Sequence, residues 1–297
     1  MLEKLADGLW ADARPFRAGP FLEIGTRMSV VRLADGGLLL HSLVEIDEGT
    51  RVALEALGAV HHLVAGNLLH HLYLASAAKA FPQAELWGAP GLAGKRKDLR
   101  FEGALDDQAP AAWKADLDQL AVRGIPRMNE VVFLHRASRT LLVTDLCFNV
   151  RHSDHLGTRL FMRANGAYGR FGPSRMLRVL VRDRPALRAS VERILDWDFD
   201  RVVVTHGDVL DVRLDAVRSV PVRIEIAEDV PVGSLVRLDT PEGLPVFAAV
   251  LQAQRQHDVR VAPGTYLLTA SGEGWSRLGK RVEVGPEGGT VVVRRSD

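Results

Sequence analysis

The sequence contains a single cysteine, Cys147, among 297 residues. One cysteine cannot form an intramolecular disulfide, and it excludes a structural zinc site built from four cysteines. Because its neighbours are apolar, we expect Cys147 to be buried and unreactive. A chain without disulfides fits a reducing compartment, so we expect a cytoplasmic protein.

Long apolar runs and an excess of charge are also absent. No stretch approaches the roughly 20 apolar residues that span a bilayer, and the acidic N-terminus does not resemble a signal peptide. The formal net charge of +1 gives no overall field that attracts nucleic acid or a membrane. We therefore expect neither as a partner.

Several catalytic signatures are missing as well. The sequence has no Gly-x-Ser-x-Gly elbow, phosphate-binding glycine-rich loop or dinucleotide fingerprint, which sets those enzyme classes aside. What it does have is 47% hydrophobic and 25% charged residues, the composition of an ordinary globular protein. Its length predicts a large unit plus a small one.

Strands and helices are predicted to alternate over the first 215 residues or so. Strands are expected within 28–42 and at 60–65, 85–87, 131–134, 140–143 and 201–205, and helices at 48–57, 70–80 and within 159–196. This alternation predicts parallel strands with helices packed on the sheets. The many arginines of 159–196 are expected to cover the solvated face of amphipathic helices.

Beyond residue 217 the pattern changes to short alternating strands and glycine-containing turns, which predicts a separate small β-domain over 218–297. Its stretch Val259–Ala270 contains Pro263-Gly264-Thr265-Tyr266 and resembles the hairpin of carboxypeptidase-regulatory-like β-sandwiches. No catalytic constellation is visible there. We expect a packing role or the binding of a protein partner.

Polar residues follow four of the predicted strands. They are His41-Ser42, Asn67 with His70 and His71, Asp145, and His206-Gly207. The carboxyl ends of parallel strands are where ligands gather in α/β sheets. Histidine and aspartate are ligands of zinc, iron and manganese, so these strand ends predict a metal site.

Several of these segments resemble a known family. Leu141–Asp145 resembles the metallo-β-lactamase superfamily strand that ends in the metal-bridging aspartate, and Val202–Gly207 resembles its terminal His-Gly motif. The stretches that resemble the branch named domain of unknown function 4336 are Arg27–Leu33, Asn67–Leu72, Asn129–Phe133 and Ser138–Leu146. The resemblance covers about the first 210 residues. It implies an α/β fold, a four-layer αββα sandwich over 1–217, followed by a small all-β sandwich over 218–297.

The chain departs from the superfamily at the metal ligands. The pattern His-x-His-x-Asp-His should follow Leu63–Ala65, but the chain has Asn67–Leu72 there, with only His70 and His71. A later Gly-His-Thr element should precede residue 131, and Gly124–Met128 contains no histidine. The resemblance therefore implies a degenerate site that holds at most one metal ion.

The remaining candidates make up a reduced site. His70 or His71, with Asp145 and His206, is predicted to hold one zinc or iron ion, or to persist as a metal-free remnant. Asp145 and His41 are the candidate catalytic groups. The expected substrate-binding residues are Asn67, Phe148, Asn149 and Lys95. Other histidines are expected outside the site, with His61 and His62 at the sheet edge or surface and His152-Ser153-Asp154-His155 in a solvated loop.

Three functions are consistent with the predicted fold and site. The first is a metal-dependent hydrolase-like protein that acts on a small ester, lactone, thioester or phosphoester. The second is a catalytically inactive binding or scaffolding protein that retains the cleft without a metal. The third is a redox role for bound iron. In each case a small-molecule substrate or ligand is expected.

Overall fold

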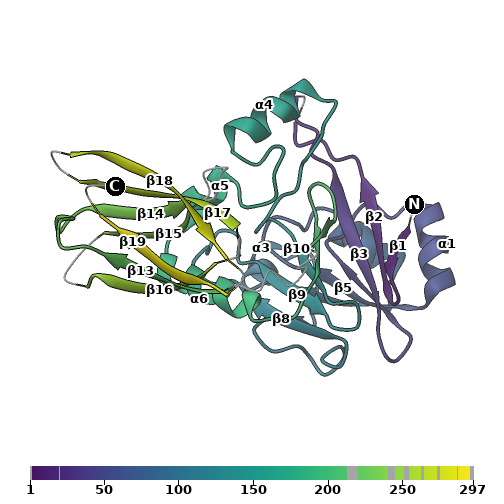
Figure 1. Cartoon of the computed structure of the whole chain (residues 1–297). Helices are drawn as coiled ribbons and strands as arrows, with labels where there is room; N and C mark the ends of the chain where they lie inside the picture. The colour runs from purple at the N-terminus through teal and green to yellow at the C-terminus, as the bar shows by residue number, and fades with distance from the viewer. Residues whose placement is uncertain are drawn as a thin grey trace. The chain divides into compact units, whose positions relative to one another are not determined.

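The computed structural model describes residues 2–19, 21–212, 220–239, 245–250, 254–261, 264–272, 275–285 and 287–294. The chain divides into two compact units, Met1–Val212 and Arg213–Asp297. The domain boundary predicted at residue 217 lies within 213–219, outside the described residues. Figure 1 colours the first unit from purple to green and the second from green to yellow.

The first unit contains two β-sheets. The first has seven strands in sequential order, β1 (Glu3–Ala6), β2 (Leu9–Arg14), β3 (Thr26–Arg32), β4 (Leu38–His41), β5 (Val60–Ala65), β6 (Glu85–Gly88) and β7 (Gly103–Ala104). The second has the order β12 (Leu210–Asp211), β11 (Arg201–Val204), β10 (Thr140–Val143), β9 (Val131–His135) and β8 (Leu117–Ala121). Strands β4 to β7 pair in parallel, as do β10 and β11, whereas β9 and β10 form the predicted antiparallel pair.

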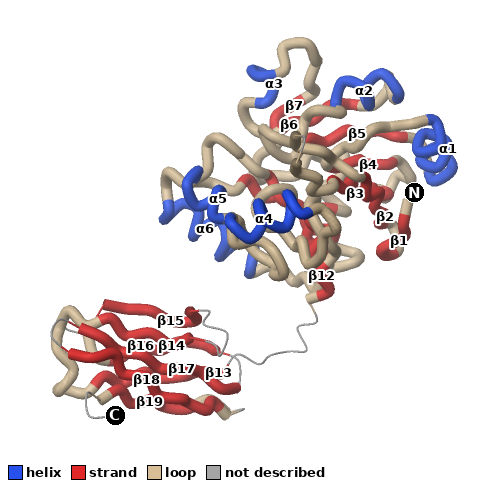
Figure 2. The backbone as a smooth tube through the Cα atoms, turned by 90° about the horizontal axis from the view of Figure 1, so that it is seen from above, coloured by secondary structure: helices blue, strands red, loops and turns tan. Residues whose placement is uncertain are grey.

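Six helices accompany these sheets in the described part of the first unit (Figure 2). They are α1 (Glu48–Leu57), α2 (Leu74–Ala80), α3 (Leu92–Lys95), α4 (Leu156–Ala164), α5 (Arg175–Leu180) and α6 (Arg184–Leu195). The helix predicted over 70–80 begins only at Leu74. Its predicted first turn is different because the Asn67 side chain accepts hydrogen bonds from the backbone N–H groups of Leu69 and His70 and turns the chain there.

Successive strand residues pack on opposite faces, and this alternation builds the layers. Leu38 and Leu40 of β4 join the cluster that contains Leu54 of α1 and Leu74 of α2, whereas Leu39 joins the cluster between the two sheets. On β10, Leu142 likewise faces the other sheet, while its neighbours pack in the cluster that includes α5 and α6 residues. The first unit is therefore the predicted four-layer αββα sandwich.

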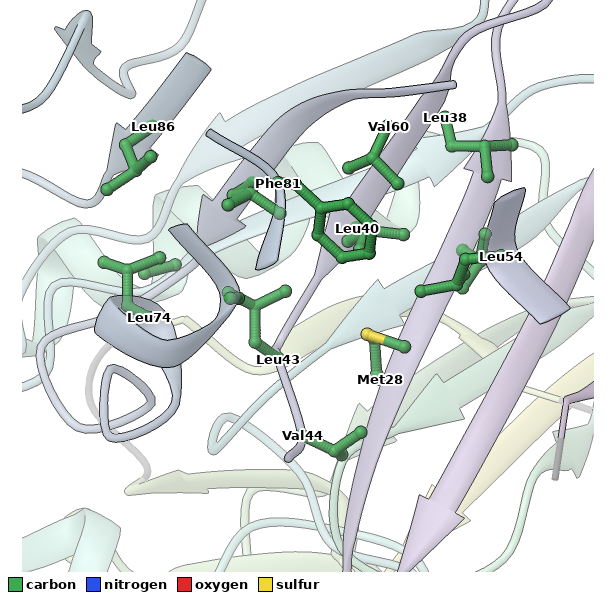
Figure 3. Packing of buried hydrophobic residues seen from close by; sticks show 14 of the residues in the cluster. Met28, Leu38, Leu40, Leu43, Val44, Leu54, Val60, Leu74, Phe81 and Leu86 are labelled. Carbon is green, nitrogen blue, oxygen red and sulfur yellow. The ribbon is translucent and has the colours of Figure 1, made fainter. Parts of the chain in front are cut away.

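Figure 3 shows the cluster on the outer face of the larger sheet. Met28, Leu40 and Leu54 are fully buried there, and Phe81, which follows α2, packs in the same cluster. Leu43 and Val44, which follow β4, belong to the same cluster. This packing anchors the chain on both sides of Ser42, at the sheet edge where the polar strand ends collect.

The second unit consists of two β-sheets with their own core. One sheet has the order β16 (Gln256–Val261), β13 (Val220–Ile226) and β19 (Gly289–Val293). The other has the order β15 (Pro245–Val250), β14 (Leu235–Asp239), β17 (Gly264–Gly272) and β18 (Trp275–Val284). The small all-β unit is as predicted, but β16 and β17 do not form the predicted hairpin. They lie in different sheets, where β16 pairs with β13, and β17 pairs with β14 and β18.

No helix in the described part of the chain is long and apolar enough to cross a membrane.

Candidate metal centre

Three strand ends bring a histidine, an aspartate and a second histidine together. His70 follows β5, Asp145 follows β10 and His206 follows β11. His70 Nε2 lies 3.2 Å from Asp145 Oδ2 and 3.1 Å from His206 Nε2, and His206 Nε2 lies 3.6 Å from Asp145 Oδ1. These side chains form the one group in the described residues whose ligand atoms could hold a metal ion.

The protonation of His206 is set by a backbone carbonyl. Its Nδ1 lies 2.7 Å from the carbonyl oxygen of Gly25, which can only accept a hydrogen bond, so Nδ1 carries the proton. In the neutral ring the lone pair of Nε2 then faces His70 and Asp145. In a metal-binding histidine, the ring nitrogen that does not bind the metal usually donates a hydrogen bond, often to a backbone carbonyl.

His70 is fixed from its other side by hydroxyl groups. Ser42 Oγ lies 3.3 Å from His70 Nδ1 and 3.0 Å from Thr205 Oγ1. Ser42 has φ 57°, in the left-handed region that serine rarely adopts. Backbone strain of this kind is typical of functional sites, and here it turns the Ser42 hydroxyl toward the histidine.

Asp145 is held by two buried residues. Asn67 Nδ2 donates to Asp145 Oδ2 over 2.7 Å. The fully buried Glu130 carboxylate accepts hydrogen bonds of 2.7 to 2.9 Å from the backbone N–H groups of Thr144, Asp145 and Leu146. The loop that presents Asp145 is therefore fixed through both its side chain and its backbone.

These contacts shift the protonation of the group. Burial lowers the pKa of His70, but the Asp145 carboxylate outweighs it and raises that pKa above its ordinary value. Burial likewise opposes ionisation of Asp145, yet His70 and His206 bring its pKa well below the ordinary value. Burial and the Asp145 charge raise the pKa of Glu130 to about 7 against its backbone donors. These shifts favour the protonated form of His70 and the ionised form of Asp145, so the two side chains attract each other.

The spacing of these atoms fits a bound metal ion. Tetrahedral zinc with bonds of about 2.0–2.1 Å to nitrogen and oxygen places neighbouring ligand atoms about 3.3 Å apart. His70 Nε2 lies 3.1 Å from His206 Nε2 and 3.2 Å from Asp145 Oδ2, both near that value, and His206 Nε2 lies 3.6 Å from the other carboxylate oxygen, Oδ1. The donor set of two imidazoles and a carboxylate suits zinc or iron and leaves a coordination position open.

The group lies at the base of a pocket of about 190 Å³. The lining residues are Phe16, Thr26, Leu43, Leu69, His70, Leu72, Tyr73, Asp145 and His206. His206 is buried, and the side chains of His70 and Asp145 are 14% and 13% exposed. A small molecule can therefore reach the candidate metal centre from solvent.

Comparisons with known proteins agree with this architecture. Residues 20–155 match the family model described as Domain of unknown function (DUF4336). A solved metallo-β-lactamase from Pontibacter korlensis is 14% identical over 72% of this chain and 94% of its own, with a TM-score of 0.51. The DIM-1 metallo-β-lactamase is 12% identical over 72% of this chain and 92% of its own, with a TM-score of 0.52. The chain has the metallo-β-lactamase fold.

The structural match extends further than the family match. His70 and Asp145 fall within residues 20–155, whereas His206 lies beyond them. No curated protein matches the chain. Sequence identities of 12% and 14% show that the fold is shared and nothing more. Any reaction of this protein therefore has to be inferred from the residues of its own site.

The remaining predicted residues lie around this candidate metal centre in different roles. His71 turns away, with its Nδ1 3.3 Å from an Arg96 guanidinium nitrogen. Lys95 Nζ donates to the Leu68 carbonyl over 2.7 Å and does not line the pocket. Asn67 is wholly buried and holds Asp145, so it has no surface for a substrate.

Phe148 and Asn149 also contact residues in or next to the site. The Phe148 ring stacks on the His206 ring, with centroids 5.5 Å apart and planes 8° from parallel. Asn149 is wholly buried, and its Nδ2 donates to the Asp208 carbonyl. Neither residue is among the described residues that line the pocket.

His41 lies apart from the group although it ends β4 as predicted. Its ring is buried against Phe133, with ring centroids 5.1 Å apart, and neither ring nitrogen has a hydrogen-bond partner among the described residues. Burial lowers the pKa of His41 to about 3, which keeps it neutral. With no access to the pocket, it is not placed to take a proton from a substrate.

Two further predictions concern histidines outside the site. His62 was predicted at the edge or surface but is buried, because β5 lies inside the sheet and the ring packs on Trp113 with centroids 5.0 Å apart. His61 is exposed as predicted. The exposed His152 lies in a loop beside Asp154, 3.4 Å away, also as predicted.

The main residues that sequence reasoning missed are Glu130 and Ser42. Glu130 directly precedes the apolar strand β9, and an acidic side chain at the edge of a buried strand was the available signal. Ser42 carried no signal beyond its place after β4. Cys147, predicted as buried and unreactive, is partly buried, and burial raises its pKa to about 12.

Proposed function

We propose that the first unit is a metal-dependent hydrolase with a mononuclear site of His70, Asp145 and His206. The observation that carries the proposal is the Gly25 carbonyl, which fixes the proton on His206 Nδ1 and leaves Nε2 bare toward the other two groups. A histidine that only packed in the core would not need this arrangement next to a second histidine and a carboxylate. One zinc or iron ion is the cofactor we propose.

Such an ion, when bound, polarises a carbonyl or phosphoryl oxygen and lowers the pKa of a water molecule toward neutrality. The protein residues supply positioning. Asn67 and Glu130 hold Asp145, Ser42 orients His70, and Phe148 stacks behind His206. Because the pKa of Asp145 is low, its carboxylate is suited to orient a water molecule rather than to remove its proton.

The proposed substrate is a small molecule with a hydrolysable ester, lactone, thioester or phosphoester bond. A pocket of about 190 Å³ above the three ligands has room for the reacting part of such a molecule. Apolar side chains around the opening reduce access of bulk water, which strengthens electrostatic interactions within the site.

Elemental analysis of tag-free protein tests the proposal. We expect about one zinc or iron per chain in the wild type, and a loss of at least most of it in His206→Ala and Asp145→Asn. His71→Ala is the matched control, because His71 neighbours His70 in sequence but pairs with Arg96, and it should keep its metal. Visible absorption distinguishes iron from colourless zinc.

A wild-type protein that stays metal-free after incubation with zinc or iron would overturn the proposal. The alternative is then a non-catalytic binding or scaffolding protein. One observation favours that alternative. Asn67 Nδ2 donates a hydrogen bond to Asp145 Oδ2 over 2.7 Å, so this oxygen has a partner without a metal.

A further inference from the structure

Most of the side chains that line the pocket of the candidate metal centre, apart from the three candidate ligands, are apolar or aromatic. Phe16, Leu43, Leu69, Leu72 and Tyr73 line it together with Thr26 and the three candidate ligands. No lysine or arginine is among these described lining residues, and Asp145 is their one acidic side chain. Nothing beyond the metal ligands is therefore placed to pair with a charged part of a substrate.

Arg17, which follows Phe16 in the sequence, pairs with Glu23 over 3.0 Å. Three further cationic side chains bind backbone carbonyls next to lining or ligand residues. Lys95 donates to the Leu68 carbonyl, and Arg96 bonds the His71 carbonyl over 2.8 Å. Arg27 donates to the carbonyls of Val204 and Gly207 over 2.7 and 2.6 Å. These side chains brace the backbone that carries His70 and His206 and are not free to bind an anion.

We infer that the pocket takes a neutral acyl compound, an ester, lactone or thioester with a short apolar chain, and that it discriminates against phosphoesters and carboxylate-bearing substrates. An anion placed against Phe16, Leu69 and Leu72 would lose hydration without a cation to replace it. That the protein hydrolyses such a compound depends on the proposed function, whereas the inference that it binds the compound depends only on the apolar side chains of the pocket.

The dimensions of the pocket limit the length of the chain. About 190 Å³ is less than the roughly 300–1,000 Å³ of sites for drug-sized ligands. Leu69 and Leu72 remain 45% and 63% exposed, so they offer apolar surface to a chain that leaves the base of the pocket. Each methylene fully buried there is expected to strengthen binding by about fourfold.

Binding of three amides tests the inference without requiring turnover. Hexanamide has a short apolar chain, acetamide lacks it, and adipamic acid carries a carboxylate at the end of the same chain. We expect ligand-observed NMR titration of the wild type to give hexanamide a Kd on the order of 10-fold lower than either of the others. Equal or tighter binding of adipamic acid would overturn the inference.

A charge placed on the wall gives a second test. Leu72→Lys should weaken hexanamide binding and strengthen adipamic acid binding, which reverses the preference. Leu195→Lys is the matched control, because Leu195 is 67% exposed at the end of α6 and does not line the pocket. An unchanged preference in Leu72→Lys would show that the wall does not select the ligand.

The two proposals fail in different ways. If the protein holds no metal but prefers hexanamide, the hydrolase proposal is wrong and the ligand class stands. If it holds metal and hydrolyses a carboxylate-bearing ester such as a monoalkyl adipate, or a phosphate ester, faster than a matched neutral acyl ester, the hydrolase proposal stands and the inferred ligand class is wrong. His206→Ala, expected to lose the metal, should keep the preference for hexanamide because Leu69 and Leu72 are unchanged.

Discussion

His41 ends β4 and His206 follows β11, yet the surroundings of the two histidines differ. His206 donates to the Gly25 carbonyl, whereas His41 has no hydrogen-bond partner for either ring nitrogen. A buried polar group without a partner destabilises the folded state. At Gly66 an added Cβ would meet His41 Nε2 at 2.6 Å, so the ring occupies space that only a glycine leaves open. His41 therefore acts as a packing residue that must stay neutral.

This neutrality predicts a specific acid sensitivity. The unfolded chain binds a proton on His41 below its ordinary pKa of 6.5, but the folded chain binds it only near pH 3. Stability is therefore lost as the pH falls from 6.5 toward 3, and between pH 7 and pH 5 His41 alone should lower the free energy of unfolding by about 2 kcal/mol. In His41→Leu this part of the pH-dependent loss of stability should disappear.

Urea unfolding at pH 7 and pH 5 measures the effect. Comparing each protein with itself at the two pH values removes any difference that the substitution makes to packing. An identical pH dependence in wild type and variant would show that the buried ring is not the group that titrates.

At the scale of elements, the ends of strands were more predictable than the contacts between them. Apolar runs revealed β5, β10 and β11. The rule that ligands gather at parallel strand ends pointed to His70 or His71, Asp145 and His206, of which the structure brings His70, Asp145 and His206 together. The choice between His70 and His71 depended on the turn made by Asn67, which pattern alone does not determine.

Other parts of the site depend on contacts distant in sequence. His62 was misplaced because its environment comes from Trp113, about fifty positions away, and not from its own strand. For Glu130 the one available signal was an acidic side chain beside an apolar strand, and its partners, backbone N–H groups at the end of another strand, could not be read from the sequence. Neither relation leaves a periodic signal in the sequence.

The loop after β10 should loosen when Glu130 is changed. In Glu130→Gln one carboxylate oxygen becomes an NH₂ group, which cannot accept from the backbone N–H groups of Asp145 and Leu146. Leaving buried donors unpaired should destabilise the protein by about 1–3 kcal/mol. Hydrogen exchange should show faster exchange at Thr144, Asp145 and Leu146.

The exposed Glu102→Gln is the control for this substitution and should leave exchange at these three amides unchanged. If Glu130→Gln kept full protection there, the carboxylate would not be what holds the Asp145 loop in place.

For the whole molecule, the important property is that the two units have separate cores. Leu63 belongs to a cluster whose members all lie in the first unit, and Leu268 belongs to one whose members lie between Val222 and Val293. The candidate metal centre is built from the first unit alone. Each unit therefore has the buried apolar surface needed to unfold as its own cooperative block.

Calorimetry of the full chain should accordingly resolve two unfolding transitions. Both leucines are fully buried, so replacing either by alanine should destabilise its own unit by about 2–5 kcal/mol. Leu63→Ala should lower the Tm of one transition and Leu268→Ala that of the other. Added zinc or iron should raise only the transition that Leu63→Ala lowers, because a ligand stabilises the unit that binds it. If both substitutions lowered one shared transition by similar amounts, the units would unfold as a single block, and the metal would then stabilise the whole chain.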